Sequence, residues 1–276
     1  MNDTTLTFIG GGNMAASLIG GLIADGWDPA RIRVADSSAE RLQQLSQQFP
    51  IYTSSDNCNA ADQADIIVLA VKPQVMQSVT RELTSLIAKQ QPLVISIAAG
   101  IPAGALGNWL GKSTAIVRTM PNTPAMVQSG ATVLYANEHV SEEQRSIAES
   151  ILRAVGVAIW IDDEALMDAV TALSGSGPAY FFLFMEALQA AGQELGLPQD
   201  TARLLTLQTA FGAAKMALES TKDAATLRHQ VTSPGGTTEH AINAFQKGEL
   251  EALVSKALQA AAKRSHELAT EFGNDS

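Results

Sequence analysis

The sequence predicts a two-domain protein in which an α/β domain is followed by an all-α domain. Seven short runs of β-branched and aliphatic residues alternate with helical patterns, an order typical of βαβ units and a mainly parallel sheet. The runs are LTFI (6–9), IRVA (32–35), DIIVLAV (65–71), PLVISIA (92–98), TAIVR (114–118), ATVLYA (131–136) and VAIWI (157–161). From Glu164 onward the runs stop, and apolar residues recur at helical spacing. We place the boundary after residue 162, which gives an α/β domain at 1–162 and a helical domain at 163–276.

Capping signals support the helices between the strands. Ser37 with Glu40, and Ser141 with Gln144, have the spacing of capping boxes, in which a serine and an acidic or amide side chain cap a helix start reciprocally. These two pairs predict helices that begin just after Ser37 and just after Ser141.

The helical domain carries more apolar surface than so small a unit can bury. An apolar stripe at helical spacing extends from Phe181 to Leu188. We interpret it first as ordinary core, with an interface as the alternative. Glycine and proline predict helix ends at Gly196 with Pro198 and at Gly248. Because apolar faces remain beyond this stripe, we expect a partner to bury part of the domain.

Composition excludes several classes of function. Hydrophobic residues make up 46% and charged residues 17% of the 276 residues, as in ordinary globular proteins. The formal net charge of -10 would repel nucleic acid, so no nucleic-acid partner is expected. The apolar runs fall far short of the roughly 20 residues that a membrane span needs. The start MNDTT lacks a basic segment, and Cys58 is the single cysteine, which together favour the cytoplasm. The four histidines lie far apart, so we expect no metal site.

The first strand leads into a glycine-rich loop that is typical of dinucleotide binding. Gly10, Gly12 and Ala15 form the pattern G-x-G-x-x-A between a strand and a helix, which predicts a tight turn that binds a pyrophosphate at a helix start. The α/β domain is therefore expected to be of Rossmann type. Asp36 follows the second strand, where a carboxylate would bind the ribose of NAD and repel the 2′-phosphate of NADP. This charge favours NADH as the cofactor.

Two further glycine-rich stretches lie in the helical domain: SGSGPAY (174–180) and TSPGGTT (232–238). Successive backbone N–H groups at a helix start, assisted by hydroxyl groups, suit a small carboxylate. Plain helix caps are the alternative interpretation, and the residues by themselves leave both open.

With these stretches the chain resembles pyrroline-5-carboxylate reductase. The motifs FIGGGNMA, AVKP, SIAAG, MPNTP, SGSGPAY and VTSPGGTT occur in that family's order over nearly the whole length, and the last has the look of the family signature. The resemblance implies reduction of 1-pyrroline-5-carboxylate to L-proline with NADPH or NADH, the last step of proline synthesis. It also implies that the helical domain is a dimerisation domain. The homodimer would interlock through these helices and could assemble into a larger ring of dimers, with active sites between one subunit's nucleotide domain and its partner's helices.

The resemblance also assigns site residues. Cofactor contacts would fall on Gly10, Gly11, Gly12, Asn13, Met14, Ser37, Asn57, Ala70, Val71, Lys72 and Pro73, with Ala98, Ala99 and Gly100 beside the nicotinamide. Substrate contacts would fall on Ser233, Gly235, Gly236, Thr237 and Thr238, with Glu164, Ser174, Gly175, Ser176 and Gly177 nearby. Many family members have Asn-Arg where this chain has Asp36-Ser37, which leaves the choice between NADP and NAD open.

The mechanism we expect places the substrate carboxylate on the SPGGTT amides and the Thr238 hydroxyl on the ring nitrogen, while hydride reaches the adjacent carbon. Thr238 is thus the candidate catalytic residue. A β-hydroxyacid dehydrogenase is one alternative. It would need a general base, for which Lys215 is the candidate among the helical lysines, although such a lysine is more often a surface residue. A nucleotide-sensing module without chemistry is the other.

Overall fold

A computed structural model describes residues 4–273 of the chain. By their contacts these residues group into two units: residues up to Ser176 together with those from Ala260 onward, and Gly177–Gln259. The domain boundary that we predict after residue 162 divides the chain at one point, whereas the contacts also assign the residues from Ala260 onward to the first unit. The boundary stays a prediction. Among the described residues, no helix combines the length and the apolarity that crossing a bilayer requires.

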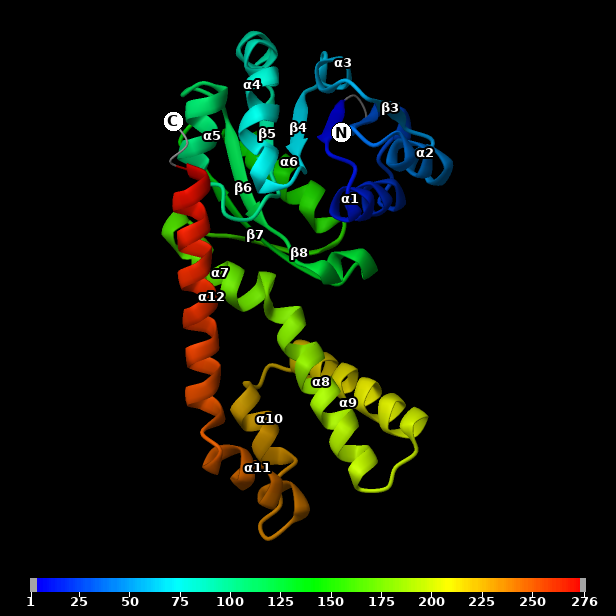
Figure 1. Cartoon of the computed structure of the whole chain (residues 1–276), viewed down its shortest axis with the longest axis vertical. Helices are drawn as coiled ribbons and strands as arrows, with labels where there is room; N and C mark the ends of the chain where they lie inside the picture. The colour runs from blue at the N-terminus through cyan, green and yellow to red at the C-terminus, as the bar shows by residue number, and fades with distance from the viewer. Residues whose placement is uncertain (1–3, 274–276) are drawn as a thin grey trace. The chain divides into compact units, whose positions relative to one another are not determined.

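The first unit contains an eight-stranded sheet in the order β3-β2-β1-β4-β5-β6-β7-β8 (Figure 1). All neighbouring strands are parallel except the antiparallel pair β6 and β7. The strands are β1 (Leu6–Ile9), β2 (Ile32–Ala35), β3 (Tyr52–Ser54), β4 (Ile66–Leu69), β5 (Leu93–Ser96), β6 (Ile116–Met120), β7 (Gly130–Ala136) and β8 (Gly156–Trp160). All seven expected runs form strands, which confirms the α/β prediction and the mainly parallel sheet. The order of β3, β2, β1, β4 and β5 is that of a Rossmann fold.

Helices cover both faces of this sheet. They are α1 (Asn13–Ala24), α2 (Ala39–Gln48), α3 (Asn57–Ala61), α4 (Pro73–Gln90), α5 (Ala103–Leu110), α6 (Glu142–Arg153) and α7 (Met167–Val170), with short turns η1 (Pro29–Arg31), η2 (Thr123–Val127), η3 (Glu164–Leu166) and η4 (Thr171–Gly175). Strand residues alternate between two buried clusters: Phe8 packs with apolar residues of α1, α2 and α6, and Ile9 with those of α3, α4 and α5. Burial on both faces accounts for the continuous apolar runs of the strands.

The capping prediction is confirmed at one site and wrong at the other. Ser141 and Gln144 form both bonds of a capping box, Ser141 N to Gln144 Oε1 at 3.0 Å and Gln144 N to Ser141 Oγ at 3.2 Å. At α2 the cap is Ser38 rather than Ser37, because the Ser38 hydroxyl accepts the Arg41 N–H at 3.2 Å. The turn after β2 is one residue longer than expected, since Ser38 N also donates to the Asp36 carboxylate at 2.8 Å.

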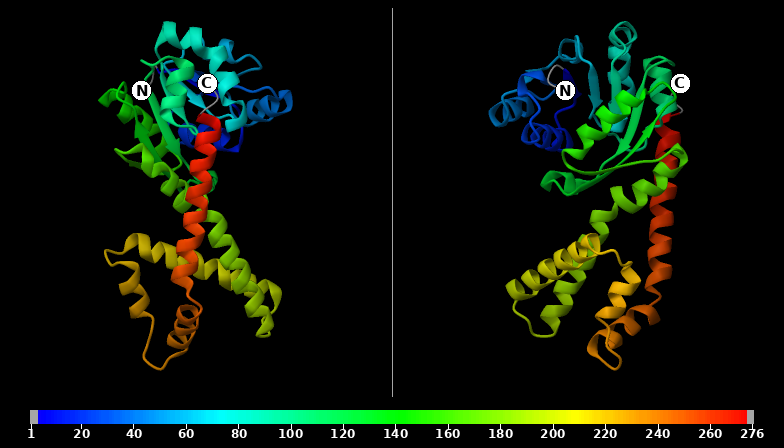
Figure 2. Two further views of the ribbon diagram at one scale, coloured as in Figure 1. Left: turned by 60° about the vertical axis from the view of Figure 1, so that its left-hand side comes forward. Right: turned by 180° about the vertical axis from the view of Figure 1, so that it is seen from behind.

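The second unit is helical throughout, as expected. It consists of α8 (Gly177–Glu194), α9 (Gln199–Glu219), α10 (Ala224–Gln230), α11 (Thr237–Lys247) and the first part of α12 (Leu250–Gly273). The helix ends predicted at Gly196, Pro198 and Gly248 are confirmed, since Gly196 has a φ of +97° and the other two cap α9 and α11. Helices α8 and α9 run side by side as a hairpin (Figure 2).

The interpretation of the α8 stripe as ordinary core is wrong for the described chain. Phe181 is 67% exposed, and Phe184, which lies 5.9 Å from the Phe245 ring, is still 44% exposed. The reason is that α8 packs mainly against α9, with Phe184 beside Phe245 of α11, so much of its apolar surface stays exposed. The alternative, an interface that a partner covers, agrees with this exposure.

Candidate active site

The glycine loop between β1 and α1 has the form that a bound pyrophosphate requires. Gly10 has a φ of +101°, and a Cβ on it would lie 2.6 Å from the carbonyl oxygen of Ala70, so only glycine fits the turn. A Cβ on Gly12 would meet no atom within 4 Å, and no side chain caps α1. The first N–H groups of α1 are therefore open to an anion. Ala15 is fully buried, as the close packing of helix on strand predicts.

Asp36 shapes this loop from the end of β2. Its Oδ2 accepts the Gly11 N–H at 2.7 Å, and its Oδ1 accepts the Ser38 N–H at 2.8 Å. Arg41, which the sequence analysis did not single out, donates from Nε to the carbonyl oxygen of Gly11 and from Nη2 to Asn13 Oδ1, the latter at 3.4 Å. A guanidinium group thus lies against the loop that is expected to hold the cofactor phosphates. Its signal in the sequence was its position in the first turn of the helix after Asp36.

The other expected cofactor residues follow strands at the same sheet edge. The segment Ala70, Val71, Lys72 and Pro73 comes directly after β4, with Pro73 as the first residue of α4, and Ala98, Ala99 and Gly100 come after β5. Asn57 begins α3 after β3, and its Nδ2 donates to Glu82 Oε2 at 2.9 Å. Because the carboxyl ends of parallel strands meet at one edge, β1 to β5 bring these segments together. Cofactor binding by each residue stays a prediction.

The stretch SGSGP is attached to the end of β6. Asn122, of the motif MPNTP, donates from Nδ2 to the carbonyl oxygen of Ser174 at 3.3 Å and to its Oγ at 3.2 Å, while its Oδ1 accepts the Ala131 N–H at 2.9 Å. A Cβ on Gly175 would lie 2.3 Å from the Met120 side chain. Ser174 and Gly175 are therefore held against the strand, and the residues that follow them, Ser176 and Gly177, lead into α8. The contact of Asn122 with Ser174 has no signal in the sequence, because the two residues lie 52 positions apart.

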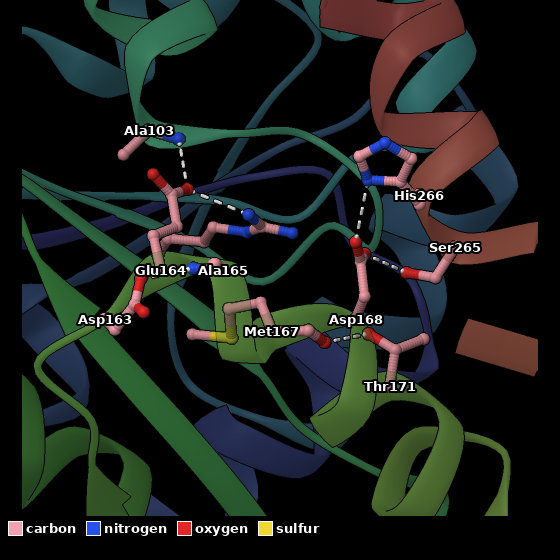
Figure 3. A network of polar contacts seen from close by, with 10 residues as sticks. Ala103, Asp163, Glu164, Ala165, Met167, Asp168, Thr171, Ser265 and His266 are labelled. Atoms are coloured by element: carbon pink, nitrogen blue, oxygen red, sulfur yellow. Dashed lines mark hydrogen bonds and ion pairs between the residues drawn. The ribbon is translucent and has the colours of Figure 1, made fainter. Parts of the chain in front are cut away.

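Glu164 joins two elements of the sheet unit (Figure 3). Its Oε1 accepts the Ala103 N–H at 2.7 Å and Arg118 Nη1 at 2.8 Å. The Arg118 side chain is 7% exposed, so the ion pair is largely shielded from water. Burial raises the pKa of Tyr135, and the carboxylates of Glu164 and Asp163 raise it further. Tyr135 therefore stays protonated at neutral pH.

The TSPGGTT stretch lies in the helical unit, where it forms the turn before α11 and the first two residues of that helix. Gly235 has a φ of +69°, and its N–H donates to Glu239 Oε2 at 2.8 Å. The Gly236 N–H donates to the carbonyl oxygen of Ser233 at 3.0 Å. No side chain caps α11, so the hydroxyl groups of this loop do not serve as its helix caps. The N–H groups of Thr237 and Thr238, in the first turn, have no intrahelical partners and remain available to a small carboxylate.

Lys215 does not have the surroundings of a general base. Its side chain is 59% exposed and forms an ion pair with Glu219 one turn along α9, Nζ to Oε1 at 3.7 Å. This is the geometry of a surface lysine, which was the alternative that the sequence favoured.

Comparison with known proteins identifies the family. A family model described as pyrroline-5-carboxylate reductase dimerisation matches residues 164–268, and one described as NADP oxidoreductase coenzyme F420-dependent matches residues 5–100. The chain is 53% identical over 273 residues to a pyrroline-5-carboxylate reductase of Pseudomonas aeruginosa, with 99% of this chain and 100% of the relative covered.

Solved structures agree with this similarity. A pyrroline-5-carboxylate reductase of Coxiella burnetii has 50% identity and a TM-score of 0.93, with 97% of this chain and 99% of that chain covered. A pyrroline carboxylate reductase of Plasmodium falciparum with NADP bound has 31% identity and a TM-score of 0.86, with 98% and 99% covered. With the glycine loop of β1, the anchored SGSGP stretch and the TSPGGTT loop in place, these similarities show that the chain belongs to the pyrroline-5-carboxylate reductase family.

Proposed function

We propose that this protein reduces 1-pyrroline-5-carboxylate to L-proline with a nicotinamide cofactor, NADPH or NADH, as the last step of proline biosynthesis. One observation carries the proposal: in a chain of this family, α1 and α11 each begin after a glycine, Gly12 and Gly236, and no side chain caps either helix start. The first suits a pyrophosphate and the second a small carboxylate.

The residues present fit a dinucleotide. Gly12 leaves space for a close approach of phosphate, and the small residues Ala98, Ala99 and Gly100 follow β5 at the edge where Rossmann folds bind their ligands. When bound there, the nicotinamide supplies the hydride. Residues 10–14 and 70–73, with Asp36, Ser37 and Asn57, would hold the rest of the cofactor.

The TSPGGTT loop would orient the substrate. The N–H groups of Thr237 and Thr238 bind the carboxylate, while the Thr238 hydroxyl hydrogen-bonds the ring nitrogen and keeps the C=N bond in place for hydride attack at the adjacent carbon. Gly235 and Gly236 support the loop, because their N–H groups are already used by Glu239 and Ser233. The stretch Ser174 to Gly177 contributes further polar contacts to the substrate.

The assembly follows from the apolar surface of the helical unit. The dimerisation family model covers residues 164–268, and the exposed stripe of α8 lies within it. A homodimer that buries this stripe would remove an apolar surface that monomers rarely expose. We propose further that dimers associate into a ring and that the enzyme works in the cytoplasm.

Two other functions fit these residues less well. A β-hydroxyacid dehydrogenase would need a general base, and the exposed, ion-paired Lys215 does not supply one. A sensing module without chemistry would leave the amides of the TSPGGTT loop without a ligand.

Steady-state kinetics with 1-pyrroline-5-carboxylate and each nicotinamide cofactor test the proposal, with loss of NAD(P)H absorbance as the signal. Thr238→Ala should lower kcat/KM for the imine by about 10²- to 10³-fold, as expected for removal of a donor to the reacting group, and leave cofactor affinity unchanged. Thr221→Ala, at an exposed threonine in the turn before α10, is the matched control and should behave as the wild type. Absence of imine-dependent oxidation in the wild type would refute the activity, and wild-type kinetics in Thr238→Ala would remove this residue from the mechanism.

A further inference from the structure

We infer that Glu164 and Asp168 are positioning residues for hydride transfer, which they support by fixing the β5–α5 loop (residues 97–102) from two sides. The inference rests on the proposed function, because it takes this loop to border the nicotinamide. The two carboxylates lie on consecutive helical segments, η3 and α7, one turn apart (Figure 3).

Glu164 holds the far end of the loop. Its Oε1 receives the N–H of Ala103, the first residue of α5, at 2.7 Å, and Arg118 Nη1 of β6 at 2.8 Å. One oxygen therefore ties the end of the loop to the neighbouring strand. Hydrogen bonds to an ionised carboxylate are shorter and stronger than neutral ones. Because Arg118 is 7% exposed, loss of the carboxylate would leave a buried cation without its counterion.

Asp168 holds the helix that packs on the middle of the loop. Its Oδ1 accepts the hydroxyl of Ser265 at 2.7 Å, and its Oδ2 lies 3.2 Å from His266 Nδ1. Both partners belong to the last part of α12, which groups with the sheet unit. Ser265 is 4% exposed, so this bond fixes α12 at a buried point, whereas the His266 side chain is 76% exposed and contributes less.

The next turns of α12 lie against the loop itself. A Cβ on Gly100 would be 3.5 Å from Leu268 Cβ and 3.8 Å from Phe272 Cδ2. A Cβ on Gly273 would be 3.7 Å from Pro102 Cδ. Movement of α12 would therefore move Gly100 and Pro102 directly, and Asp168 restrains that movement.

The loop depends on these supports because its own backbone is irregular. Gly100 has a φ of +75°, and the segment lies between the end of β5 and the start of α5. Ala98 and Ile101 are buried and anchor two points of the loop, which leaves Ala99 and Gly100 between them to be placed by their neighbours. An error of about 1 Å in such a segment costs up to about 100-fold in rate, since hydride transfer requires close and aligned atoms.

The test compares Glu164→Gln, Glu164→Ala, Asp168→Asn and Ser265→Ala with the control Asp162→Asn. Asp162 is an exposed carboxylate two residues before Glu164, and it takes no part in the bonds that Glu164 and Asp168 form to Ala103, Arg118, Ser265 and His266. The measurements are kcat, KM for each substrate, the kinetic isotope effect with NAD(P)H deuterated at the transferred position, and the thermal unfolding midpoint.

Glu164→Ala should lower kcat by about 10- to 100-fold and raise the isotope effect, because hydride transfer becomes rate-limiting when its geometry is lost. Glu164→Gln retains an acceptor for Ala103 and should recover part of kcat. Asp168→Asn and Ser265→Ala should lower kcat by about 3- to 10-fold with the same rise in isotope effect, and Asp162→Asn should match the wild type.

Three results would overturn the inference. One is an unchanged kcat in variants that fold; another is a lower kcat with an unchanged isotope effect and a lower unfolding midpoint, which indicates a purely structural role. A third is a rise in KM for the imine alone in Glu164→Gln, which indicates direct substrate contact. Should Glu164→Ala fail to fold, the milder variant Glu164→Gln decides for Glu164, and Ser265→Ala decides for Asp168. A wild type without imine reduction would contradict the proposed function instead, so the two failures are distinguishable.

Discussion

Alanine at Gly10 and alanine at Gly12 add the same methyl group two residues apart, yet the structure predicts opposite effects. At Gly10 the new Cβ would lie 2.6 Å from the carbonyl oxygen and 2.7 Å from the carbonyl carbon of Ala70, and φ is +101°. Backbone atoms cannot rotate aside as a side chain can. The left-handed conformation costs about 1–2 kcal/mol and the overpacking about 1–3 kcal/mol. At about 3 kcal/mol in total, the unfolding midpoint should fall by roughly 6–12 °C.

At Gly12 the same methyl group meets nothing within 4 Å, and the backbone has a φ of -64° and a ψ of -177°, which alanine adopts without strain. The folded state should change by about 0.5 kcal/mol or less, so the midpoint stays within about 2 °C. The methyl group does occupy the space at the start of α1 where a pyrophosphate would approach. We expect cofactor affinity to fall by about 100-fold, equivalent to about 2.7 kcal/mol.

Thermal unfolding and fluorescence titration with NADPH and NADH check both effects on the same samples. The reasoning is refuted if Gly12→Ala binds cofactor as well as the wild type, because the loop would then not hold the phosphates. It is also refuted if Gly12→Ala is destabilised as much as Gly10→Ala, since the open space around Gly12 would then not exist in solution.

Three further predictions concern individual side chains. Burial, with the charges of Asp56 and Glu82, raises the pKa of the Cys58 thiol, so alkylation by iodoacetamide at pH 7 should be slow. Glu82→Gln removes one negative charge and should accelerate the alkylation, which mass spectrometry can follow. An equal rate in this variant would contradict a contribution of the Glu82 charge to the pKa. Arg41→Ala removes the guanidinium from the glycine loop and should weaken NADPH binding by about tenfold, or about 1.4 kcal/mol. A fluorescence titration measures this Kd, and an unchanged Kd would contradict the prediction. Ser141→Ala breaks the capping box of α6 and should cost about 1 kcal/mol in denaturant unfolding, whereas Ser146→Ala, within the same helix, should cost less.

Most of the fold could be predicted because its strands are buried on both faces and therefore read as continuous apolar runs. Strand β3 (Tyr52–Ser54) was missed because it lacks such an apolar run. It is three residues long, lies at the sheet edge and has an exposed tyrosine. The cap of α2 was wrong by one residue, because the Asp36 carboxylate accepts the Ser38 N–H and lengthens the turn before the helix. The α8 stripe was misjudged because helical periodicity shows that a face is apolar and not which chain covers it.

The candidate site divides in the same way. The turns and uncapped helix starts at the glycine loop and the TSPGGTT stretch could be predicted, because each depends on residues close together in sequence. That these two places bind anions stays a prediction. Arg118 was not predictable, because its partner Glu164 is 46 residues away and the pair exists only once β6 and η3 have come together. Asn122 was missed for the same reason.

The geometry around Asp36 changes the argument on cofactor choice. From spacing alone, a free carboxylate after β2 favours NADH, because it would repel the 2′-phosphate of NADPH. In the structure both oxygens of this carboxylate accept backbone N–H groups, from Gly11 and Ser38. Asp36 therefore has a structural role in shaping the loop, and this role is enough to account for an acidic residue at this position. The Arg41 guanidinium contacts the same loop and places a positive charge within reach of it. Opposite charges on two sides of one loop offset each other, so repulsion by Asp36 alone is a weak argument against NADPH. We therefore expect cofactor preference to depend on the balance between Asp36 and Arg41, which both contact Gly11 of the glycine loop.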